Sequence, residues 1–489
     1  MNKLPEMLIR AICLTAGLCL VSTAATAFDS GSTGVDGAFS PTVNTTLQVP
    51  PDGIFNFTEV SIPSGVTVGF NPNTSNTPVT ILASGNVSVA GTLHVNGHWA
   101  TNVGASGDGN VGDDGIPGKA VPGGYAGGRG GVPGGGNGQH GLGPGGGTGG
   151  YFVYSNWVAG GGGGGFGSAG SQSVGYYYPG YEYAAGGPTY GSSLLLPLVG
   201  GSGGGGGRGG AAFHGSGGGA GGGAILVAAT GALRVTGAIY AVGGNSGASG
   251  GSGSGGTGGG GSGGAIRLVA TRIEGNGTIQ AAGGATGSHP TSSRFRGGNG
   301  GNGRIRLEAD SITRTAATNP VYSFGQPTTV FVSGLPSLRI TSVAGVEAPA
   351  YPTGSADIVL PADTPNPVTV TFESTGVPVG NTIKLSIIGA TSYNGSSAVT
   401  PALVGTTDLA TASVDINLPS GPTSLLAQTT YTLLTSQGDQ LAVYTEGERV
   451  EKVRLSASMR GAGAITLITV SGKEYELPSR LPGMPATAG

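Results

Sequence analysis

The sequence GGGAILVAATGALRVTGAIYAVGGN, at residues 221–245, recurs in altered form elsewhere in the chain. Its other copies are PVTILASGNVSVAGTLHVNG (78–97), SGGAIRLVATRIEGNGTIQAAGG (262–284) and the shorter GGNGRIRLEADSI (300–312). Aligned on Ile225, Ile266 and Ile305, the later copies recur about every 40 residues, a period that is typical of stacked repeat architectures. The chain from 28 to 325 is therefore predicted to be a stack of similar units.

Each copy consists of short runs in which apolar residues alternate with others, and single glycines separate the runs. In the copy at 78–97, Gly85 and Gly91 divide three such runs, and this alternation is typical of strands. Three strands per copy predict one rung of an all-β, parallel β-helix or solenoid-like domain. A lone rung cannot bury its apolar face, so rungs must stack. We expect the copies at 78–97 and 221–245 to be neighbours in space.

Glycine accounts for 105 of the 489 residues, and charged residues for only 9%. The densest part is a Gly-rich insertion at about 102–220, in which Glu182 and Arg208 are the only charged residues after Val132. Such a segment is either a flexible linker or a packed bundle of extended polyglycine helices. We favour the bundle because YFVYSNW (151–157), GYYYPGYEY (175–183) and LLLPLV (194–199) offer side chains to pack against.

From Gln326 glycine becomes less frequent, and runs rich in Val, Ile, Leu and Thr alternate with turn residues. This spacing predicts an Ig-like β-sandwich at 326–478, followed by a flexible tail at 479–489. The predicted strands are Val330–Val332, Ser337–Val343, Asp357–Leu360, Val368–Glu373, Thr382–Ile388, Ser413–Leu418, Tyr431–Leu434, Leu441–Tyr444, Val450–Ala457 and Ile465–Val470.

The first 27 residues are typical of a secretory signal peptide. Lys3 and Arg10 precede or flank an apolar stretch, and Ala25-Thr26-Ala27 forms a small-residue cleavage site. Both cysteines lie within this segment, so the mature chain is expected to contain no disulfide. The net charge of −3 gives no reason to expect nucleic acid as a partner, and no later segment is predicted to anchor in a membrane. We expect an extracellular, cell-surface or periplasmic protein.

Candidate metal ligands are few. The segment GDGNVGDDGIPG (107–118) offers oxygen ligands suited to calcium, but its spacing departs from that of an EF-hand loop. The ligands are Asp108, Asn110, Asp113 and Asp114. His94 and His98 lie four residues apart, about 13 Å along a strand, which is too far to share an ion. We favour a solvated turn at 107–118 and expect no cofactor.

A carbohydrate-active enzyme, either a polysaccharide lyase or a hydrolase on a β-helix, is the main enzymatic alternative. Such enzymes need clustered carboxylates, or basic groups beside a carboxylate. The candidates are Arg267, Glu274, Arg294, Arg296, Arg304, Arg306 and Glu308. Arg267 and Arg306 occupy the same repeat position, so we expect them to stack as an exposed arginine ladder. Because such a ladder needs no catalytic role, we predict no catalytic residue.

Aromatic residues in the Gly-rich insertion are the candidate ligand-binding surface. Flat rings that carry hydroxyl or N–H groups suit sugars. The candidates are Trp157, Tyr176, Tyr177, Tyr178, Tyr181 and Tyr183. The alternative, which we favour, is that these rings pack the insertion together.

The repeats GGAIRLVA and GRIRLEA, the segment LLLPLVGGSGGGGG (from Leu194) and the C-terminal VEKVRLSA and TLITVSGKEYELP together resemble an uncharacterised family of bacterial secreted glycine-rich repeat proteins. The composition of the insertion also resembles the glycine-rich region of certain receptor ectodomains. Neither resemblance implies a catalytic residue. We therefore expect a non-enzymatic secreted or cell-surface scaffold with a structural or adhesive role, whose partner is a cell-surface polysaccharide or another copy of the chain.

Overall fold

The computed structural model describes most of the chain after residue 27. The described residues are 28–104, 114–151, 159–174, 183–250, 255–289, 295–327, 330, 336–349, 357–388, 396–419, 421, 423–445, 447–459 and 461–478. The predicted signal peptide and the predicted tail lie outside this set. Within it the chain is nearly all β, and its one α-helix is α1 (Thr435–Leu441), so the all-β prediction is confirmed.

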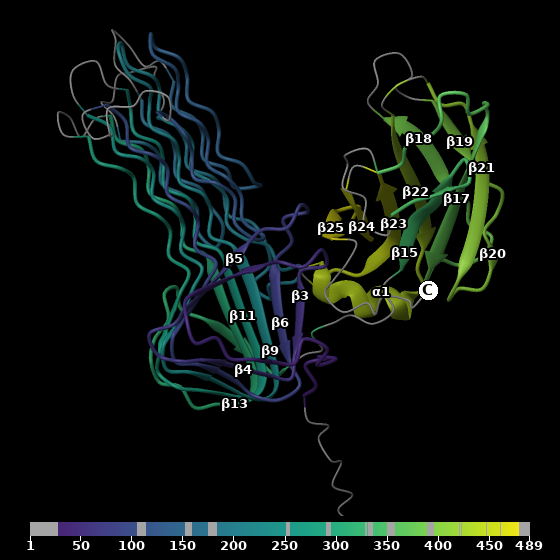
Figure 1. Ribbon diagram of the computed structural model, residues 1–489, viewed down its shortest axis with the longest axis horizontal. Coiled ribbons are helices and arrows are strands. Elements are labelled where there is room, and N and C mark those ends of the chain that lie inside the picture. The colour runs from purple at the N-terminus through teal and green to yellow at the C-terminus, as the bar shows by residue number, and fades with distance from the viewer. Residues whose placement is uncertain are drawn as a thin grey trace, which may run out of the picture.

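The repeats form two sheets in which every neighbouring pair of strands is parallel (Figure 1). The first sheet contains β1 (Ala38–Phe39), β3 (Ile54–Phe57), β4 (Glu59–Ile62), β6 (Val79–Ala83), β7 (Val87–Val89), β9 (Ala224–Val235), β11 (Ala265–Glu274), β13 (Arg304–Ile312) and β14 (Ser323–Gly325). The second contains β2 (Thr45–Gln48), β5 (Thr67–Asn71), β8 (Thr92–His94), β10 (Ala238–Tyr240) and β12 (Thr278–Gln280). The copies at 78–97, 221–245 and 262–284 contribute strands to both sheets, whereas the shorter copy at 300–312 contributes β13 to the first sheet alone.

The apolar core of the repeats consists of residues from the inner faces of these sheets. Because the strands pair in register, equivalent residues of successive copies stack, so that Ile225 pairs with Ile266 and Ile266 with Ile305. Val79 of β6 pairs with Ile225 of β9. The prediction that the copies at 78–97 and 221–245 are spatial neighbours is therefore confirmed, and the 40-residue period is the distance along the chain from one pairing to the next.

The Gly-rich insertion packs as extended segments that lie side by side, joined by segments that run into and out of the strands (Figure 1). We call this assembly the glycine bundle. Its segment 200–210 donates backbone hydrogen bonds with a three-residue repeat, which is the repeat of a polyproline II-type helix. Gly203, Gly206 and Gly209 donate to 136–142, Gly204 and Gly207 donate to 216–219, and Gly205 and Arg208 donate to 159–162.

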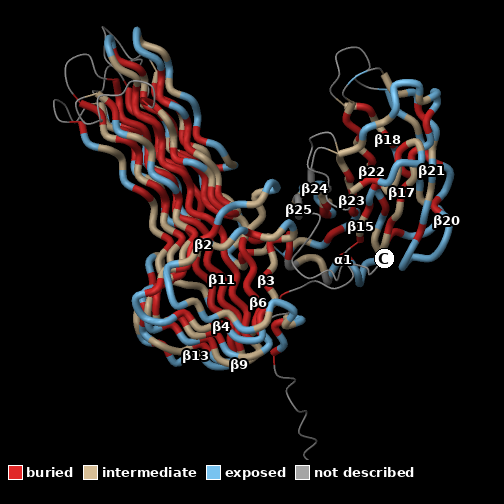
Figure 2. The backbone as a smooth tube through the Cα atoms, in the orientation of Figure 1, coloured by how far each residue is buried: buried red, intermediate tan, exposed pale blue. Residues whose placement is uncertain are grey.

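Close backbone contacts explain why this segment is almost all glycine. A Cβ atom on Gly203 would lie 2.0 Å from the carbonyl oxygen of Ala126, and one on Gly204 would lie 2.1 Å from that of Gly259. No side chain fits at such distances, so the neighbours at these glycines are held mainly by backbone hydrogen bonds. Buried residues extend along the bundle (Figure 2). Of the two states expected for the insertion, the structure has the packed one over its described residues.

The C-terminal region contains two antiparallel sheets. One consists of β15 (Ser337–Val343), β16 (Val346–Glu347), β17 (Val368–Thr375), β20 (Val404–Gly405) and β21 (Ala410–Ile416). The other consists of β18 (Lys384–Ile388), β19 (Ser397–Val399), β22 (Ser424–Thr432), β23 (Val450–Ser458), β24 (Gly461–Thr469) and β25 (Glu474–Pro478). Both contribute to one buried cluster, which includes Phe372 and Leu455.

Two strands predicted in this region are wrong. Leu441–Tyr444 is the end of α1 followed by the 3-10 helix η3 (Ala442–Tyr444), because a four-residue apolar run does not distinguish a strand from a short helix. Asp357–Leu360 forms no strand. Among the described helices, none has the length and apolar character that a membrane span requires.

Candidate functional site

Three charged side chains meet on the outer face of the first sheet. Arg267 lies on β11, and Arg306 and Glu308 lie on the neighbouring β13. In β11 the flanking Ile266 and Leu268 belong to the inner core, so alternation along the strand turns Arg267 outward. Arg267 pairs in register with Arg306, and Glu308 is two residues farther along, so all three side chains share one face.

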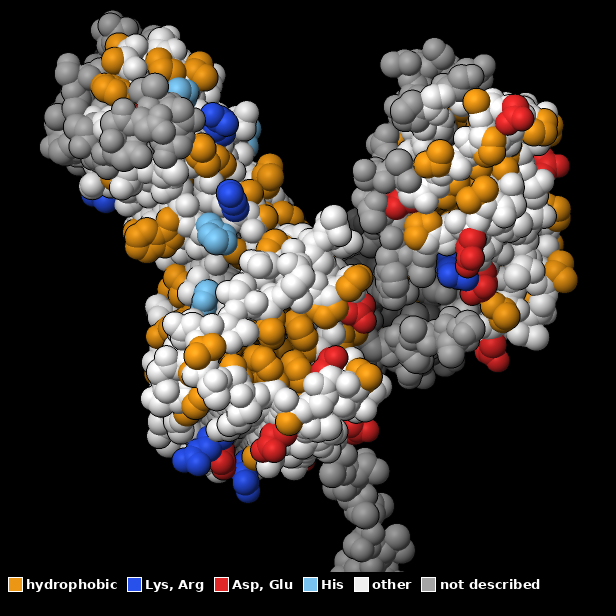
Figure 3. Space-filling view, in the orientation of Figure 1, with side chains coloured by type: hydrophobic (Ala, Val, Ile, Leu, Met, Phe, Trp, Pro, Cys, Tyr) orange, Lys and Arg blue, Asp and Glu red, His pale blue; other side chains and the backbone are white. Residues whose placement is uncertain are grey.

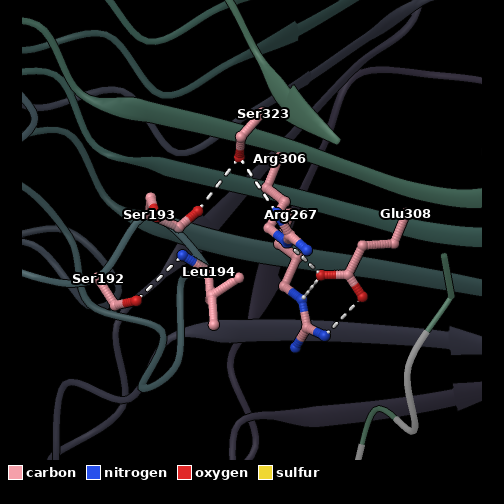
Figure 4. Close-up of polar contacts among 7 residues, drawn as sticks. All are labelled: Ser192, Ser193, Leu194, Arg267, Arg306, Glu308 and Ser323. Atoms are coloured by element: carbon pink, nitrogen blue, oxygen red, sulfur yellow. Dashed lines mark hydrogen bonds and ion pairs between the residues drawn. The ribbon is translucent and has the colours of Figure 1, made fainter. Parts of the chain in front are cut away.

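These residues form a closed ion-pair cluster, which we call the Arg-Glu-Arg cluster (Figure 4). The Arg267 guanidinium donates two hydrogen bonds to the Glu308 carboxylate, from Nε to Oε1 at 3.1 Å and from Nη2 to Oε2 at 2.9 Å. Arg306 Nε donates to Oε1 of the same carboxylate at 2.6 Å. Bidentate pairing of this kind is the strongest geometry available to arginine and a carboxylate.

The Arg-Glu-Arg cluster is buried. Arg267 and Glu308 are each 1% exposed, and Arg306 is 9% exposed. The stacking of Arg267 on Arg306 was predicted, but the prediction of an exposed ladder is wrong. A covering segment, separated by about 70 residues in sequence from β11, could not be located from the repeat pattern.

The covering segment is residues 190–199 of the Gly-rich insertion, which we call the strap. Leu195 and Leu198 of the strap pack in one buried cluster with Leu226 and Val269 of the outer sheet face. Polar contacts also hold the strap in place. Ser323 of β14 donates to the carbonyl oxygen of Ser193 at 3.2 Å, and the amide of Leu194 donates to Ser192 Oγ at 3.1 Å. Arg306 Nη1 donates to Ser323 Oγ at 3.4 Å, which links the strap to the Arg-Glu-Arg cluster (Figure 4).

Arg304 holds the start of the strap. Its guanidinium donates to the carbonyl oxygen of Tyr190 at 3.1 Å and lies 5.7 Å from the centre of the Phe166 ring. The Tyr190 ring packs against the Phe166 ring, tilted by 46°, with ring centres 4.8 Å apart. The Tyr190 hydroxyl donates to the carbonyl oxygen of Gly200 at 2.6 Å and accepts from Ser202 Oγ at 2.9 Å. Burial raises the pKa of Tyr190, so this phenol stays protonated.

The strap also contacts the C-terminal region. Leu196 packs against the C-terminal apolar cluster, whereas its neighbour Leu195 points into the cluster on the first sheet. Leu195 has a φ angle of 53°, a left-handed conformation that is uncommon for leucine. Burial raises the pKa of Tyr444, and the charge of Arg267 partly lowers it, so Tyr444 of η3 lies near the Arg-Glu-Arg cluster. The strap and cluster are thus the junction of the two regions.

The geometry of the cluster suits a structural role. Both oxygens of Glu308 accept hydrogen bonds from guanidinium groups, and the carboxylate is buried. A general acid or base must reach its substrate, and 1% exposure leaves no such route to Glu308. What the cluster can do chemically is fix the relative positions of β11, β13 and the strap.

The other residues weighed for the enzyme alternative lie elsewhere. Glu274 pairs with Arg272 at 3.1 Å on a partly exposed part of β11. Arg296 lies in the glycine bundle, where its carbonyl oxygen accepts from the amide of Val174. Arg294 lies outside the described residues. The structure therefore brings together Arg267, Arg306 and Glu308, with Arg304 at the strap, and not the whole predicted set.

The predicted ligand-binding and calcium residues fall mostly outside the described residues. This holds for Trp157, Tyr176, Tyr177, Tyr178 and Tyr181, and for Asp108, Asn110 and Asp113. Tyr183 is described and half-buried, and Asp114 is 4% exposed. Within the described part of the chain, no three His, Cys, Asp or Glu side chains are grouped so that they could hold a metal ion.

Sequence reasoning did not locate the strap, although it singled out LLLPLV as apolar. The apolar run stands out in a segment dominated by glycine, but the sheet residues that it contacts are distant in sequence and no local pattern identifies them. Comparisons of this chain with family models, with curated proteins and with solved structures find no match.

Proposed function

We propose that this chain is a non-enzymatic, exported scaffold with a structural or adhesive role, and that adhesion includes the binding of glycans. Its repeats would form a β-helix, its insertion a polyglycine-type bundle, and its C-terminal sheets an Ig-like sandwich. Extracellular, cell-surface or periplasmic location follows from the signal-peptide pattern at the N-terminus. The membership of a bacterial secreted glycine-rich family is part of the same proposal.

The observation that carries this proposal is the closed Arg-Glu-Arg cluster. Of the charged residues considered for catalysis, the structure brings together Arg267, Arg306 and Glu308. Both arginines form ion pairs with the Glu308 carboxylate. A buried ion pair positions the elements that carry it and is costly to expose. The cluster is therefore used to join parts of the scaffold.

The glycine bundle supports the same function. Backbone hydrogen bonds are made along every segment described above, and they need no particular side chains. Such a bundle can extend a rigid body away from the sheets without an additional apolar core. A scaffold that spaces or presents surfaces makes use of that property.

The test uses the mature chain, residues 28–489. Retention on bacterial cells and on immobilised polysaccharides is measured beside self-association by light scattering. We expect at least one of these to be positive. The proposal is wrong if the protein binds no cell, no polysaccharide and no second copy of itself.

The rival function is a polysaccharide lyase or hydrolase on the β-helix. Incubation with a panel of polysaccharides, followed by assays for new reducing ends and for unsaturated ends, separates the two. We expect no turnover above that of heat-denatured protein. Turnover by the native protein that is lost in a folded Glu308→Gln variant would favour the enzyme.

A further inference from the structure

The second sheet presents an outward face that differs from that of the first sheet. Val68, Leu93, Ile239 and Ile279 of its strands belong to the inner core, so the alternate residues point outward. These outward residues are half-buried or exposed, except for Gly69 and Ala238. We call this surface the polar face.

Strand pairing arranges the polar face in rows. The first row contains Thr67, Thr92, Ala238 and Thr278, which are register partners along four strands. The second row contains Thr46, Gly69, His94, Tyr240 and Gln280. Neighbouring strands lie about 4.8 Å apart, so five strands present hydroxyl, amide and ring groups over about 20 Å.

Gly69 allows the His94 ring of the second row to lie on the sheet. A Cβ atom at this position would be 3.1 Å from His94 Nε2, so the imidazole rests against the glycine backbone. Burial, and to a lesser degree the neighbouring His98, lower the pKa of His94, which keeps the ring uncharged near neutral pH. Its buried Nδ1 has no hydrogen-bond partner within the described chain.

An exposed indole lies close to this row in sequence. Trp99 is 72% exposed. Its segment follows β8, and there the amide of Gly97 donates a hydrogen bond to the carbonyl oxygen of Val242. A large exposed aromatic ring is unfavourable in water and frequently marks a binding surface. Trp99 follows His94 of this row by five residues.

Charge decides which class of ligand fits. Neither row contains Asp, Glu, Lys or Arg. Charged side chains are sparse on the visible side of the repeat region (Figure 3). An acidic polysaccharide would need Arg or Lys opposite its carboxylates, and a calcium-bridged one would need protein carboxylates. Hydroxyls, amides and neutral rings instead complement an uncharged polymer of sugars.

We propose that the polar face binds an extended, uncharged polysaccharide along the direction in which its strands stack. Tyr240 and His94 contact the flat faces of the sugars, and the threonine row and Gln280 exchange hydrogen bonds with their hydroxyls. This proposal rests on the proposed adhesive function and gives it a surface that is distinct from the predicted tyrosine cluster of the insertion.

The experiment measures binding of the mature chain to laminarin, xylan and hydroxyethylcellulose, with alginate and polygalacturonate as acidic counterparts, by affinity electrophoresis. Tyr240→Ala and Thr278→Arg alter the polar face. Phe324→Ala is the matched control, because Phe324 is 74% exposed on β14 of the first sheet. Thermal unfolding of each variant shows that it is folded.

We expect at least one neutral polysaccharide to bind, at least tenfold more weakly in Tyr240→Ala and Thr278→Arg and unchanged in Phe324→Ala. Equal binding by all variants would overturn the polar face as the site while leaving the adhesive function intact. Binding to acidic polysaccharides only would overturn the assigned ligand class. Failure to bind any polysaccharide would overturn this proposal, and the scaffold function would then depend on the cell-retention and self-association assays.

Discussion

The two sheets of the repeat region share one core but have unlike outer faces. The outer face of the first sheet packs against the strap and other segments and contains the Arg-Glu-Arg cluster, with Glu308 at 1% exposure. The outer face of the second sheet carries threonine, amide and ring groups that are largely half-buried or exposed. The same repeated sequence therefore supports two kinds of surface.

The difference teaches how an insertion changes a repeat. The Gly-rich insertion leaves after β8 and returns at β9, and on the way it places Leu195 and Leu198 against the first sheet. Charged groups can remain on a covered face only when they are paired, since an unpaired buried charge is costly. The second sheet has no such cover in the described chain and carries no charge in its two rows.

Breaking the charge balance of the covered face is expected to have the largest effect. Glu308→Gln leaves two buried guanidinium groups facing a neutral amide, which costs about 3 to 5 kcal/mol of unfolding free energy. Urea unfolding followed by circular dichroism measures the change.

A matched control is Glu274→Gln, because the Glu274–Arg272 pair is partly exposed and should lose less than about 1 kcal/mol. Equal losses in the two variants would mean that burial of the Arg-Glu-Arg cluster does not determine its contribution. Replacing Arg267, Arg306 and Glu308 together by Met, Leu and Leu should cost less than Glu308→Gln alone, because no unpaired charge remains.

The second-largest loss of stability is expected from steric overlap within the glycine bundle. Gly204→Ala places a Cβ atom 2.1 Å from the carbonyl oxygen of Gly259, and packed segments must move apart, at a cost of about 3 kcal/mol. Gly134→Ala is the control: its φ is +84° but nothing lies within 4 Å of its Cβ position, so only the backbone cost of about 1 kcal/mol applies. Thermal unfolding compares them, and a Gly204→Ala protein as stable as the control would contradict the packed bundle.

Removing the strap's apolar contact should have a similar or slightly smaller effect. Leu195 is 1% exposed, so Leu195→Ala leaves a cavity and is expected to cost about 2 to 3 kcal/mol. Leu142→Ala, at a position that is 57% exposed, should change stability by less than about 0.5 kcal/mol. Limited proteolysis adds a specific readout, because a loosened strap is cut before the sheets. Unchanged proteolysis of Leu195→Ala would show that the strap is held by its polar contacts alone.

Much of the repeat region could be predicted from sequence, because its pairing repeats a local pattern. The alternation around Ile225, Ile266 and Ile305 predicts which residues face the core, and the strands pair as that alignment requires. The strands predicted at Ser337–Val343 and Val450–Ala457 likewise match β15 and β23 closely. Periodicity determines these elements, and periodicity is visible in a single sequence.

The candidate site could be predicted only in part. Stacking of Arg267 on Arg306 followed from the repeat, but the burial of both depends on the strap at 190–199, which no periodic signal connects to β11. The hydrogen bonds of the glycine bundle are also beyond sequence patterns, since Gly203, Gly204 and Gly205 look alike yet donate to three different segments. Both the burial of the cluster and the hydrogen bonds of the bundle depend on contacts between segments that are far apart in sequence.

The smallest effect on stability is expected on the polar face. Tyr240 is half-buried and Thr278 is exposed, so Tyr240→Ala and Thr278→Ala should each change the free energy of unfolding by less than about 1 kcal/mol. Urea unfolding beside Leu195→Ala gives the comparison directly. If Tyr240→Ala proved as destabilising as Leu195→Ala, the ring would be part of the packed fold, and loss of glycan binding in that variant would no longer locate a site. A small effect means that these side chains contribute little to folding, which leaves them available to contact a ligand.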